Sequence, residues 1–404
     1  MPKPVLTIFY QFNPWQSSIG GIQTFICSFL KYAPEEFKVR LVGTGEPNSC
    51  TGLWQEREYA GRSIQFMPLI ALEDDNIRSL IPTTLKYTAA LWRRNFASDF
   101  MHFHRIEPTV AAFKWSGEKS VFFHNDIQKQ MDPVAGNNAI LWQRFPTGYF
   151  ALESQLIKQF DQIYFCHSES AKFYQRRYPS ISERIAYLKN PVDNEIFYPL
   201  APEQRQEKRK ALARELNLPE ETRFLLFAGR LHPQKDPLLL ISAFAVLKDP
   251  SVHLLIAGDG ELAEQMRREI ARYQLSNRVT MFGAIKQKKL ADLHKISSAF
   301  ILTSTYEGLP IVVLEALSCG TPLVMTNCGE IPKFLPADSG IVCQKRTPQV
   351  IARALGQVLQ HPENYSAANC VRTAQPYSAR TVVTDVYQAM LQRWQQPAFA
   401  STAA

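Results

Sequence analysis

Short runs of β-branched and aromatic residues alternate with segments of helical periodicity along the whole chain. Continuous apolar runs bounded by Gly, Asn or Pro are typical of buried parallel strands. In the first half the expected strands are 5–10, 37–42, 63–69, 100–104, 120–124, 162–166 and 184–188. In the second half they are 223–229, 252–258, 278–283, 299–304, 322–326 and 340–343. Helical patterns, for example over 22–33 and 83–97, follow most of them, so the sequence predicts two doubly wound α/β domains.

The boundary between the two series is expected near residues 190–210, where three prolines precede a charged run. This gives a first domain over residues 1–194 and a second over residues 195–377. The last helical pattern, over 378–394, can serve either domain. The small, unpatterned residues of the tail, 396–404, predict disorder.

Composition narrows the class of protein only moderately. The 404 residues are 46% hydrophobic and 20% charged, as in ordinary globular proteins. No apolar run reaches the ~18–20 residues of a membrane span, and the first one is too short for a secretory signal. Seven cysteines occur without a CxxC pair, which favours a reducing cytoplasm over a disulfide framework or a zinc site.

The net charge of +8 is spread over the chain. Residues 1–194 hold 21 Lys and Arg against 18 Asp and Glu, and the remainder holds 24 against 19. A nucleic-acid-binding protein usually concentrates such an excess, so no nucleic-acid partner is expected. A mildly basic surface is compatible with anionic small molecules or an anionic membrane face, and equally with no specific partner.

Ligands of doubly wound sheets bind at the carboxyl ends of the strands, so functional residues are expected in the strand-to-helix turns. The first turn contains Gly20 and Gly21 at the expected start of a helix. Paired glycines let a phosphate approach the free N–H groups there, although a tight turn alone also explains them. The spacing is not the GxGxxG of a dinucleotide site.

Two cations follow the first strand of the second half. Gly229 and Arg230 end this strand, and Lys235 precedes Asp236, an expected N-cap, and Pro237, an expected first helical residue. Arg and Lys beside a helix N-terminus suit a diphosphate, whereas a solvated loop with two ordinary basic residues is the alternative.

Two glutamates lie around the start of a later helix. Glu307 precedes Pro310, which is expected to open the helix, and Glu315 falls within its apolar run. A carboxylate accepts the two hydroxyls of a ribose or of a sugar. The alternatives are an exposed helix position for Glu315 and a capping role for Glu307.

Together these pieces resemble a known family. The pattern FAGRLHPQK, IAGDG, FGAI and YEGLPIVVLEALSCGTPLV is similar to the retaining glycosyltransferases of sequence family four, whose E-x7-E signature would be Glu307 and Glu315. The resemblance is strong over 223–345 and looser over 1–190, where the GG turn and VFFHND also match. It implies the GT-B fold, with two Rossmann-like domains facing a cleft and the helix over 378–394 crossing back to the first domain.

The resemblance also implies roles for individual residues. Arg230 and Lys235 would bind the donor diphosphate, Glu315 the ribose and Glu307 the transferred sugar. His124 would face the cleft near the sugar and the acceptor. The remaining residues expected to line the nucleotide-sugar site are Gly20, Gly21, Gly229, Gly258, Gly260, Ile285, Gly308, Leu309, Pro310 and Ile311.

Other candidates stay open. His102 and His104 share one side of a strand, but a metal site would need further ligands that the sequence does not offer. No DxD motif occurs, and EDD at 73–75 lacks its spacing, so no metal and no cofactor is expected. The aromatic and basic segments 91–96 and 141–150 suit sugar stacking or a membrane interface, or else a core-facing helix with a basic edge.

The expected function is metal-independent, retaining transfer of a hexose from a nucleotide sugar, with UDP-glucose as the first expectation. The acceptor would be a polysaccharide or a lipid-linked saccharide, and the location the cytoplasm or the inner face of its membrane. The alternatives are a UDP-sugar epimerase on the same fold, a Rossmann-type oxidoreductase, which the absence of GxGxxG disfavours, and an inactive binding homologue.

Overall fold

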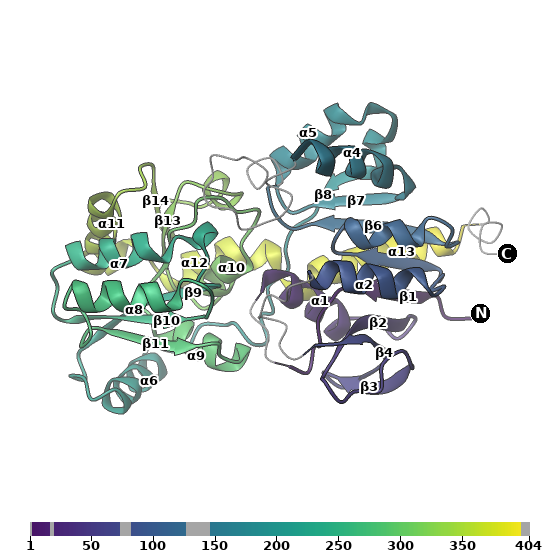
Figure 1. The fold of residues 1–404 in the computed structure, drawn as a ribbon. Helices are drawn as coiled ribbons and strands as arrows, with labels where there is room; N and C mark the ends of the chain where they lie inside the picture. Colours follow the sequence, from purple (N-terminus) through teal and green to yellow (C-terminus); the bar gives the residue numbers. More distant parts are fainter. Residues whose placement is uncertain (1, 17–19, 73–81, 127–145, 397–404) are drawn as a thin grey trace. The chain divides into compact units, whose positions relative to one another are not determined.

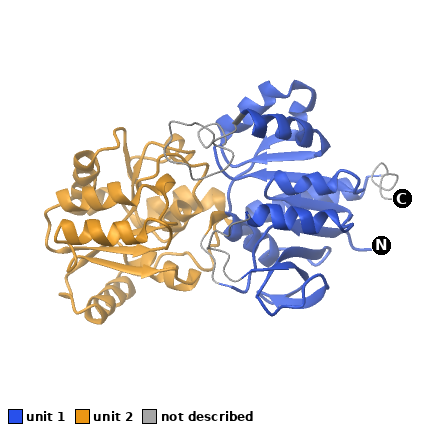
Figure 2. Ribbon diagram, viewed as in Figure 1, with its two compact units in different colours: residues 1–18, 22–191, 379–404 blue, residues 19–21, 192–378 orange. Residues whose placement is uncertain are grey.

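The computed structural model describes residues 2–16, 20–72, 82–126 and 146–396. The chain forms two compact units (Figure 2). Unit 1 consists of residues 1–18, 22–191 and 379–404, and unit 2 of residues 19–21 and 192–378. The predicted tail from 397 onwards lies outside the described residues. The predicted cleft stays a prediction.

Unit 1 is built on an eight-stranded sheet in the order β3-β4-β2-β1-β5-β6-β7-β8 (Figure 1). All neighbouring pairs are parallel except β3 and β4. The chain leaves β1 to one side for β2 and returns on the other side as β5, so the switch point of this doubly wound sheet lies between β1 and β5. The strands are β1 (Val5–Phe9), β2 (Lys38–Gly45), β3 (Gln55–Tyr59), β4 (Arg62–Ala71), β5 (Phe100–Phe103), β6 (Glu118–Phe123), β7 (Gln162–Phe165) and β8 (Ile185–Tyr187).

The helices of unit 1 include one from the far end of the chain. They are α1 (Gly21–Lys31), α2 (Thr83–Trp92), α4 (Pro146–Leu156), α5 (Ser168–Arg177) and α13 (Ala379–Trp394), with the short 3-10 helix η1 (Glu107–Ala112). In α13, Arg393 binds the Glu118 carboxylate with two nitrogens at 2.7 and 2.8 Å. The Tyr387 hydroxyl donates to the Phe29 carbonyl at 3.0 Å. These bonds tie α13 to the sheet and to α1.

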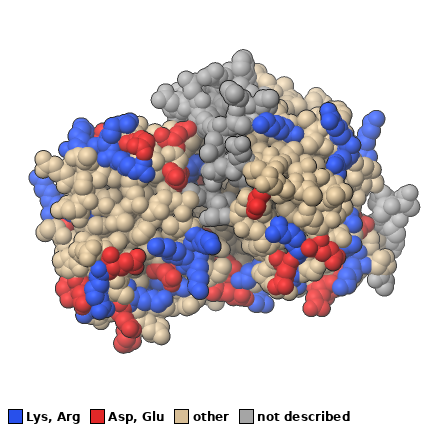
Figure 3. Space-filling model, turned by 60° about the horizontal axis from the view of Figure 1, so that its bottom comes forward, with Lys and Arg blue, Asp and Glu red and all other residues tan. Residues whose placement is uncertain are grey.

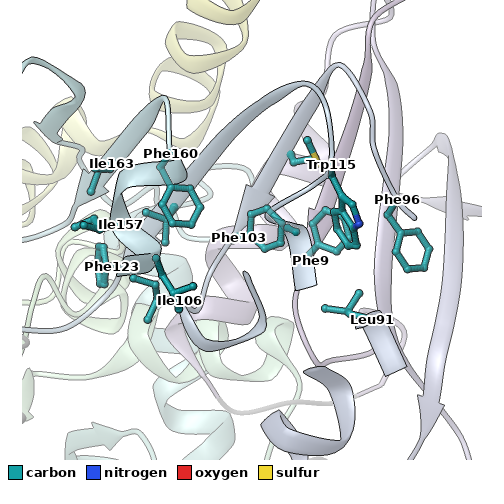
Figure 4. Packing of buried hydrophobic residues seen from close by; sticks show 14 of the residues in the cluster. Phe9, Leu91, Phe96, Phe103, Ile106, Trp115, Phe123, Ile157, Phe160 and Ile163 are labelled. Carbon is teal, nitrogen blue, oxygen red and sulfur yellow. The ribbon is translucent and has the colours of Figure 1, made fainter. Parts of the chain in front are cut away.

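Aromatic rings fill the core of unit 1 (Figure 4). Phe9 of β1 stacks on Phe103 of β5 at a centroid distance of 4.6 Å, and Trp115 and Phe96 contact Phe9 from the side. Full burial of such side chains stabilises the fold by roughly 1.5–3 kcal/mol each. The core therefore fixes the strand ends that border the switch point.

Unit 2 has a six-stranded parallel sheet in the order β11-β10-β9-β12-β13-β14. This is the 3-2-1-4-5-6 order of doubly wound folds, with the switch point between β9 and β12. The strands are β9 (Arg223–Ala228), β10 (Val252–Ala257), β11 (Val279–Gly283), β12 (Ala299–Leu302), β13 (Leu323–Thr326) and β14 (Gly340–Cys343). The helices are α6 (Pro202–Glu215), α7 (Pro237–Val246), α8 (Ala263–Arg272), α9 (Gln287–Ile296), α10 (Ile311–Ser318), α11 (Pro348–Gln360) and α12 (Ala367–Ala374). Both doubly wound α/β units predicted from the sequence are confirmed.

The predicted boundary segment differs from the structure in two respects. Residues 202–210, interpreted as linker, form the first part of α6, whose charged side chains are mostly exposed. Residues 192–194 belong to unit 2, because the Val192 N–H donates to the Tyr377 carbonyl at 2.8 Å. None of the helices in the described part of the chain is long and apolar enough to span a membrane.

Candidate functional site

The turns that end β9, β10 and β11 form a hydrogen-bonded row in unit 2. The Gly229 N–H donates to the Ala257 carbonyl at 3.0 Å, and the Gly258 N–H donates to the Gly283 carbonyl at 2.8 Å. Gly258 is required by this arrangement, because a Cβ there would lie 1.9 Å from the Gly229 carbonyl oxygen. Gly260 is also closely packed, because a Cβ there would lie 2.6 Å from the Leu231 carbonyl oxygen. Three of the predicted glycines therefore shape one edge of the sheet.

Lys235 and Glu307 meet at the switch point of this sheet. Lys235 lies in the turn after β9 and Glu307 in the turn after β12, and these strands are neighbours. The Lys235 ammonium lies 2.5 Å from the Glu307 carboxylate. The side chain of Glu307 is only 5% exposed and that of Lys235 16% exposed. A nearly buried carboxylate therefore has a cation as its partner, and Glu307 is not a helix cap as the alternative supposed.

Backbone bonds hold these two turns together. The Thr303 hydroxyl donates to the Lys235 carbonyl at 2.9 Å and lies 3.0 Å from the Asp236 carbonyl. The Thr305 N–H donates to the Gln234 carbonyl at 2.8 Å, and the Gln234 amide donates to the Tyr306 carbonyl at 3.1 Å. The position of Lys235 relative to Glu307 is thus set by the backbone as well as by the ion pair.

Asp236 begins helix α7 in the manner predicted. Its carboxylate accepts the Leu239 N–H at 3.2 Å, and Pro237 is the first helical residue. Its φ of 44° lies in the left-handed region, which is costly for a residue other than glycine. The Arg346 guanidinium binds the other carboxylate oxygen at 2.5 Å. Arg346 was not predicted from the sequence, although it follows β14 at the carboxyl edge of the sheet.

Arg230 follows Gly229 at the end of β9 and is exposed. Within the described residues its guanidinium has no hydrogen bond or ion pair. It therefore keeps all its donors for a ligand at this edge.

Glu315 is buried in helix α10, so the alternative of an exposed position is wrong. The pKa of its carboxyl is raised to about 8, mainly by burial; a hydrogen bond from Gln287 lowers this pKa and the nearby Asp193 raises it. A carboxyl with this pKa is mostly protonated at neutral pH, and it can then donate as well as accept a hydrogen bond.

The residues before α10 are buried and in contact with the next turn. Helix α10 begins at Ile311, one residue later than predicted, because Pro310 takes the N-cap position. The Gly308 carbonyl accepts the Glu330 N–H at 2.9 Å, and Leu309 and Pro310 are buried. Ile285 is half-buried in the connection between β11 and α9.

In unit 1, two histidines meet at the ends of β5 and β6. The His104 Nδ1 lies 3.0 Å from the His124 Nε2, and the two rings stack at 5.2 Å. Burial lowers the pKa of His124 to about 3 and that of His104 well below its usual value. Both rings are therefore neutral at physiological pH, with one proton between the facing nitrogens. His102 lies on β5, two residues before His104, and is also buried. Its pKa is lowered to about 3 by burial and by the nearby Arg393.

The other sequence candidates lie as follows. Gly21 is the first residue of α1, and Gly20 precedes it. Segments 73–75 and 141–145 lie outside the described residues. Of segment 91–96, Leu91 and Phe96 enter the core whereas Trp92 is exposed. No cluster of three potential metal ligands occurs among the described side chains, and metal independence stays a prediction.

A family model described as glycosyl transferases group 1 matches residues 208–375. A D-inositol 3-phosphate glycosyltransferase of Streptomyces griseus is 28% identical over 263 residues, which cover 59% of this chain and 56% of that protein. An uncharacterised glycosyltransferase of Methanocaldococcus jannaschii is 29% identical over 167 residues, 41% of this chain and 39% of that protein. The chain spans about half the length of the curated relatives it matches.

Solved structures share the fold over nearly the whole chain. Sucrose-phosphate synthase from Thermosynechococcus elongatus superposes with a TM-score of 0.78 and 18% identity, covering 97% of this chain and 99% of that one. The Anabaena protein Alr3699/HepE in complex with UDP-glucose gives a TM-score of 0.71 and 17% identity, covering 96% and 100%. The GT-B fold predicted from the sequence is confirmed.

Proposed function

We propose that the chain transfers a hexose, with retention, from a nucleoside-diphosphate sugar to a saccharide acceptor, on the basis of the match of residues 208–375 to the model of the group 1 glycosyl transferases. UDP-glucose is the proposed donor, and a polysaccharide or lipid-linked saccharide the proposed acceptor. The Anabaena neighbour whose complex contains UDP-glucose supports this choice of donor.

The observation that carries the proposal is the Lys235–Glu307 pair at the switch point of unit 2. The diphosphate is bound by the Lys235 ammonium and the free Arg230 guanidinium, which neutralise the charge of the leaving nucleotide. Glu307 then accepts hydroxyls of the transferred sugar. Three hydrogen bonds hold the two turns in place: the Thr303 hydroxyl donates to the Lys235 carbonyl, and the Thr305 N–H and hydroxyl donate to the Gln234 carbonyl. Little ordering of the backbone is therefore left for the moment of reaction.

Glu315 holds the ribose in this proposal. Its protonated carboxyl donates to one ribose hydroxyl and accepts from the other. Gly20, Gly21, Gly229, Gly258, Gly260, Ile285, Gly308, Leu309, Pro310 and Ile311 line the rest of the nucleotide-sugar site.

Unit 1 holds the acceptor, with His124 beside the transferred sugar. None of the proposed site carboxylates is assigned as a covalent nucleophile. Retention therefore follows from a front-face reaction, in which the leaving phosphate takes the acceptor proton. The bond from the anomeric carbon to the diphosphate breaks and the bond to the acceptor oxygen forms on the same face.

Incubation with a panel of nucleotide sugars, each with and without EDTA, tests the function. We expect slow release of nucleoside diphosphate from one donor, most rapidly UDP from UDP-glucose, and the same rate in EDTA. Loss of turnover that returns with added metal would contradict metal independence. No release from any donor, with or without saccharide acceptors, would contradict the transferase.

The same samples separate the rival functions. An epimerase would convert the UDP-sugar into its epimer without release of UDP. An oxidoreductase would change nicotinamide absorbance instead. Either result in place of nucleotide release would replace the proposed function.

A further inference from the structure

Exposed large hydrophobic side chains concentrate in one part of unit 1. Among the described residues of unit 1, the exposed ones are Leu53, Trp54, Leu85, Trp92 and Phe113. All lie on helix α2, on the turn before β3 or just after η1. Single exposed apolar residues are ordinary, whereas a group of this size, with two tryptophans, marks an interaction surface.

Contacts in the core bring these three segments together. Trp54 contacts the Phe96 ring at 6.1 Å, and Phe96 contacts Trp115 at 5.7 Å. The Arg94 guanidinium donates to the Gly52 carbonyl at 2.6 Å. Figure 4 shows Phe96 and Trp115 in the same region of the core as Leu91, the buried neighbour of Trp92. Phe113 is two residues from Trp115, so two of the three segments that carry the exposed side chains also supply this buried aromatic group, and the third contacts it through Trp54.

Helix α2 presents a regular apolar face to solvent. Leu85 and Trp92 are seven residues apart and therefore on the same face, with exposed fractions of 55% and 63%. Exposed Ala89 lies between them, while Tyr87 and Leu91 face the core. The exposed face is about 10 Å long at 1.5 Å per residue.

The exposed charges on these segments are positive. The described segments 50–54, 82–98 and 109–117 contain Lys86, Arg93, Arg94 and Lys114. Of the acidic residues within two positions of their ends, Asp99 and Glu107 are half-buried and Glu118 is buried, whereas Glu56 is exposed. On the face of the molecule drawn in Figure 3, acidic and basic side chains are interspersed. Tryptophan and leucine flanked by Lys and Arg are the side chains that enter the headgroup region of an anionic bilayer.

We propose that Leu53, Trp54, Leu85, Trp92 and Phe113, with Lys86, Arg93 and Lys114, form a docking surface for an anionic lipid bilayer. The protein lies on the membrane through α2. The Thr84 hydroxyl, at the start of α2, accepts from Arg105, which directly follows His104 at the end of β5. The surface therefore extends from the far end of α2 to the carboxyl edge of the unit 1 sheet, where a lipid-linked acceptor would be held under the proposed function.

Vesicle sedimentation tests the surface without any nucleotide sugar. We expect the protein to sediment with phosphatidylcholine vesicles that contain about 30 mol % phosphatidylglycerol, and hardly at all with phosphatidylcholine alone. Raising the salt from about 50 mM to about 500 mM should weaken binding several-fold, because the charges are exposed and screened.

Two double variants test the residues. Leu85→Ala with Trp92→Ala removes apolar area, and Lys86→Glu with Arg93→Glu reverses charge; each should lower binding to anionic vesicles at least about fivefold. The controls in unit 2 are Val246→Ala with Tyr273→Ala, which alter an exposed aliphatic and an exposed aromatic residue, and Lys248→Glu with Arg268→Glu, which reverse two exposed charges. Thermal melting checks that each variant folds.

The proposal is overturned if the unaltered protein does not bind anionic vesicles, or if the surface variants bind as it does. It is also overturned if the controls lose as much binding. Should light scattering show a dimer that the Leu85/Trp92 variant abolishes, without vesicle binding, the surface serves a second copy of the chain instead. Because the donor-release assay uses no lipid, failure of the glycosyltransferase proposal and failure of this one are seen separately.

Discussion

The Lys235 ammonium lies 2.5 Å from the Glu307 carboxylate, although the two residues are 72 positions apart in the chain. Each is proposed to bind a different part of the donor. The pair therefore has to give way when a diphosphate arrives, because one ammonium cannot keep its shortest contact with both anions. This exchange makes the effects of the two side chains on nucleotide binding opposite in sign.

Lys235→Met should weaken UDP binding by ~1.5–3 kcal/mol, or roughly 10- to 150-fold, the range for a charge-assisted hydrogen bond. Titration calorimetry with UDP measures it. Arg230→Met should act in the same direction. Lys248→Met, an exposed lysine after α7, is the matched control and should change nothing. Unchanged UDP affinity in both the Lys235 and Arg230 variants would remove them from the diphosphate site.

Glu307→Gln should lower turnover while UDP binding stays the same or becomes a few-fold tighter, because the variant frees Lys235 for the phosphates. The loss of turnover is expected since a contact that orients the sugar is used in the transition state. Calorimetry and a donor-consumption assay give the two quantities. A clear loss of UDP affinity would contradict the assignment of Glu307 to the sugar.

Glu315 should make stability fall as the pH rises. Its carboxyl has a pKa near 4.5 when unfolded and about 8 when folded, so the folded state holds the extra proton between these values. The contribution of the protonated Glu315 to the free energy of unfolding is fully present below about pH 4.5 and is lost as the pH rises through 8. Melting temperatures between pH 6 and 9 should therefore fall more for the native chain than for Glu315→Gln. Parallel curves would exclude a buried, protonated Glu315.

The His104–His124 pair predicts that kcat/KM does not fall at acidic pH through the titration of a histidine. With the pKa of His124 at about 3 and that of His104 also depressed, kcat/KM should show no ionisation near 6.5. His104→Asn keeps a hydrogen-bonding partner for His124 and should retain more activity than His104→Phe. An acidic limb near pH 6.5 that the His124→Asn variant lacks would show that this histidine titrates in function.

Arg346 and Asp236 should act as a unit that positions Lys235. Arg346→Ala removes the cation that holds the left-handed Asp236 turn, and UDP affinity should drop several-fold. Asp236→Gly adopts this φ without strain and caps α7 nearly as well. In the Asp236→Gly background the Arg346→Ala change should then have little further effect. Additive losses in the double variant would mean that the two residues act independently.

The strands were predictable because they are continuous apolar runs. The exception is β3, whose sequence, QEREY, begins with four polar residues and has no apolar run to mark it. Residues 202–210 were misread as linker because an exposed helix face made of charged residues has the same composition. The helix predicted over 83–97 ends at Trp92, since its boundary depends on the turn that follows and not on periodicity.

The site was predictable in its parts and not in its contacts. Motif and turn positions identified Lys235, Glu307 and Glu315, yet their pairing depends on which strands are neighbours. The burial of Glu315, and with it the altered pKa, follows from packing against α9 and the segment after Val192. Arg346 forms its ion pair with Asp236, which lies 110 positions earlier in the chain, and no local sequence pattern indicates this contact.

Helix α13 has a consequence for the order in which the protein folds during synthesis. It completes unit 1, yet the ribosome makes it only after residues 192–378, which supply nearly all of unit 2. Until then Glu118 lacks the Arg393 guanidinium, and a buried carboxylate without its cation is costly. Unit 2 can therefore reach its final structure while the nascent first unit is still waiting for its last helix, the reverse of the usual N-terminal-first sequence of domain folding.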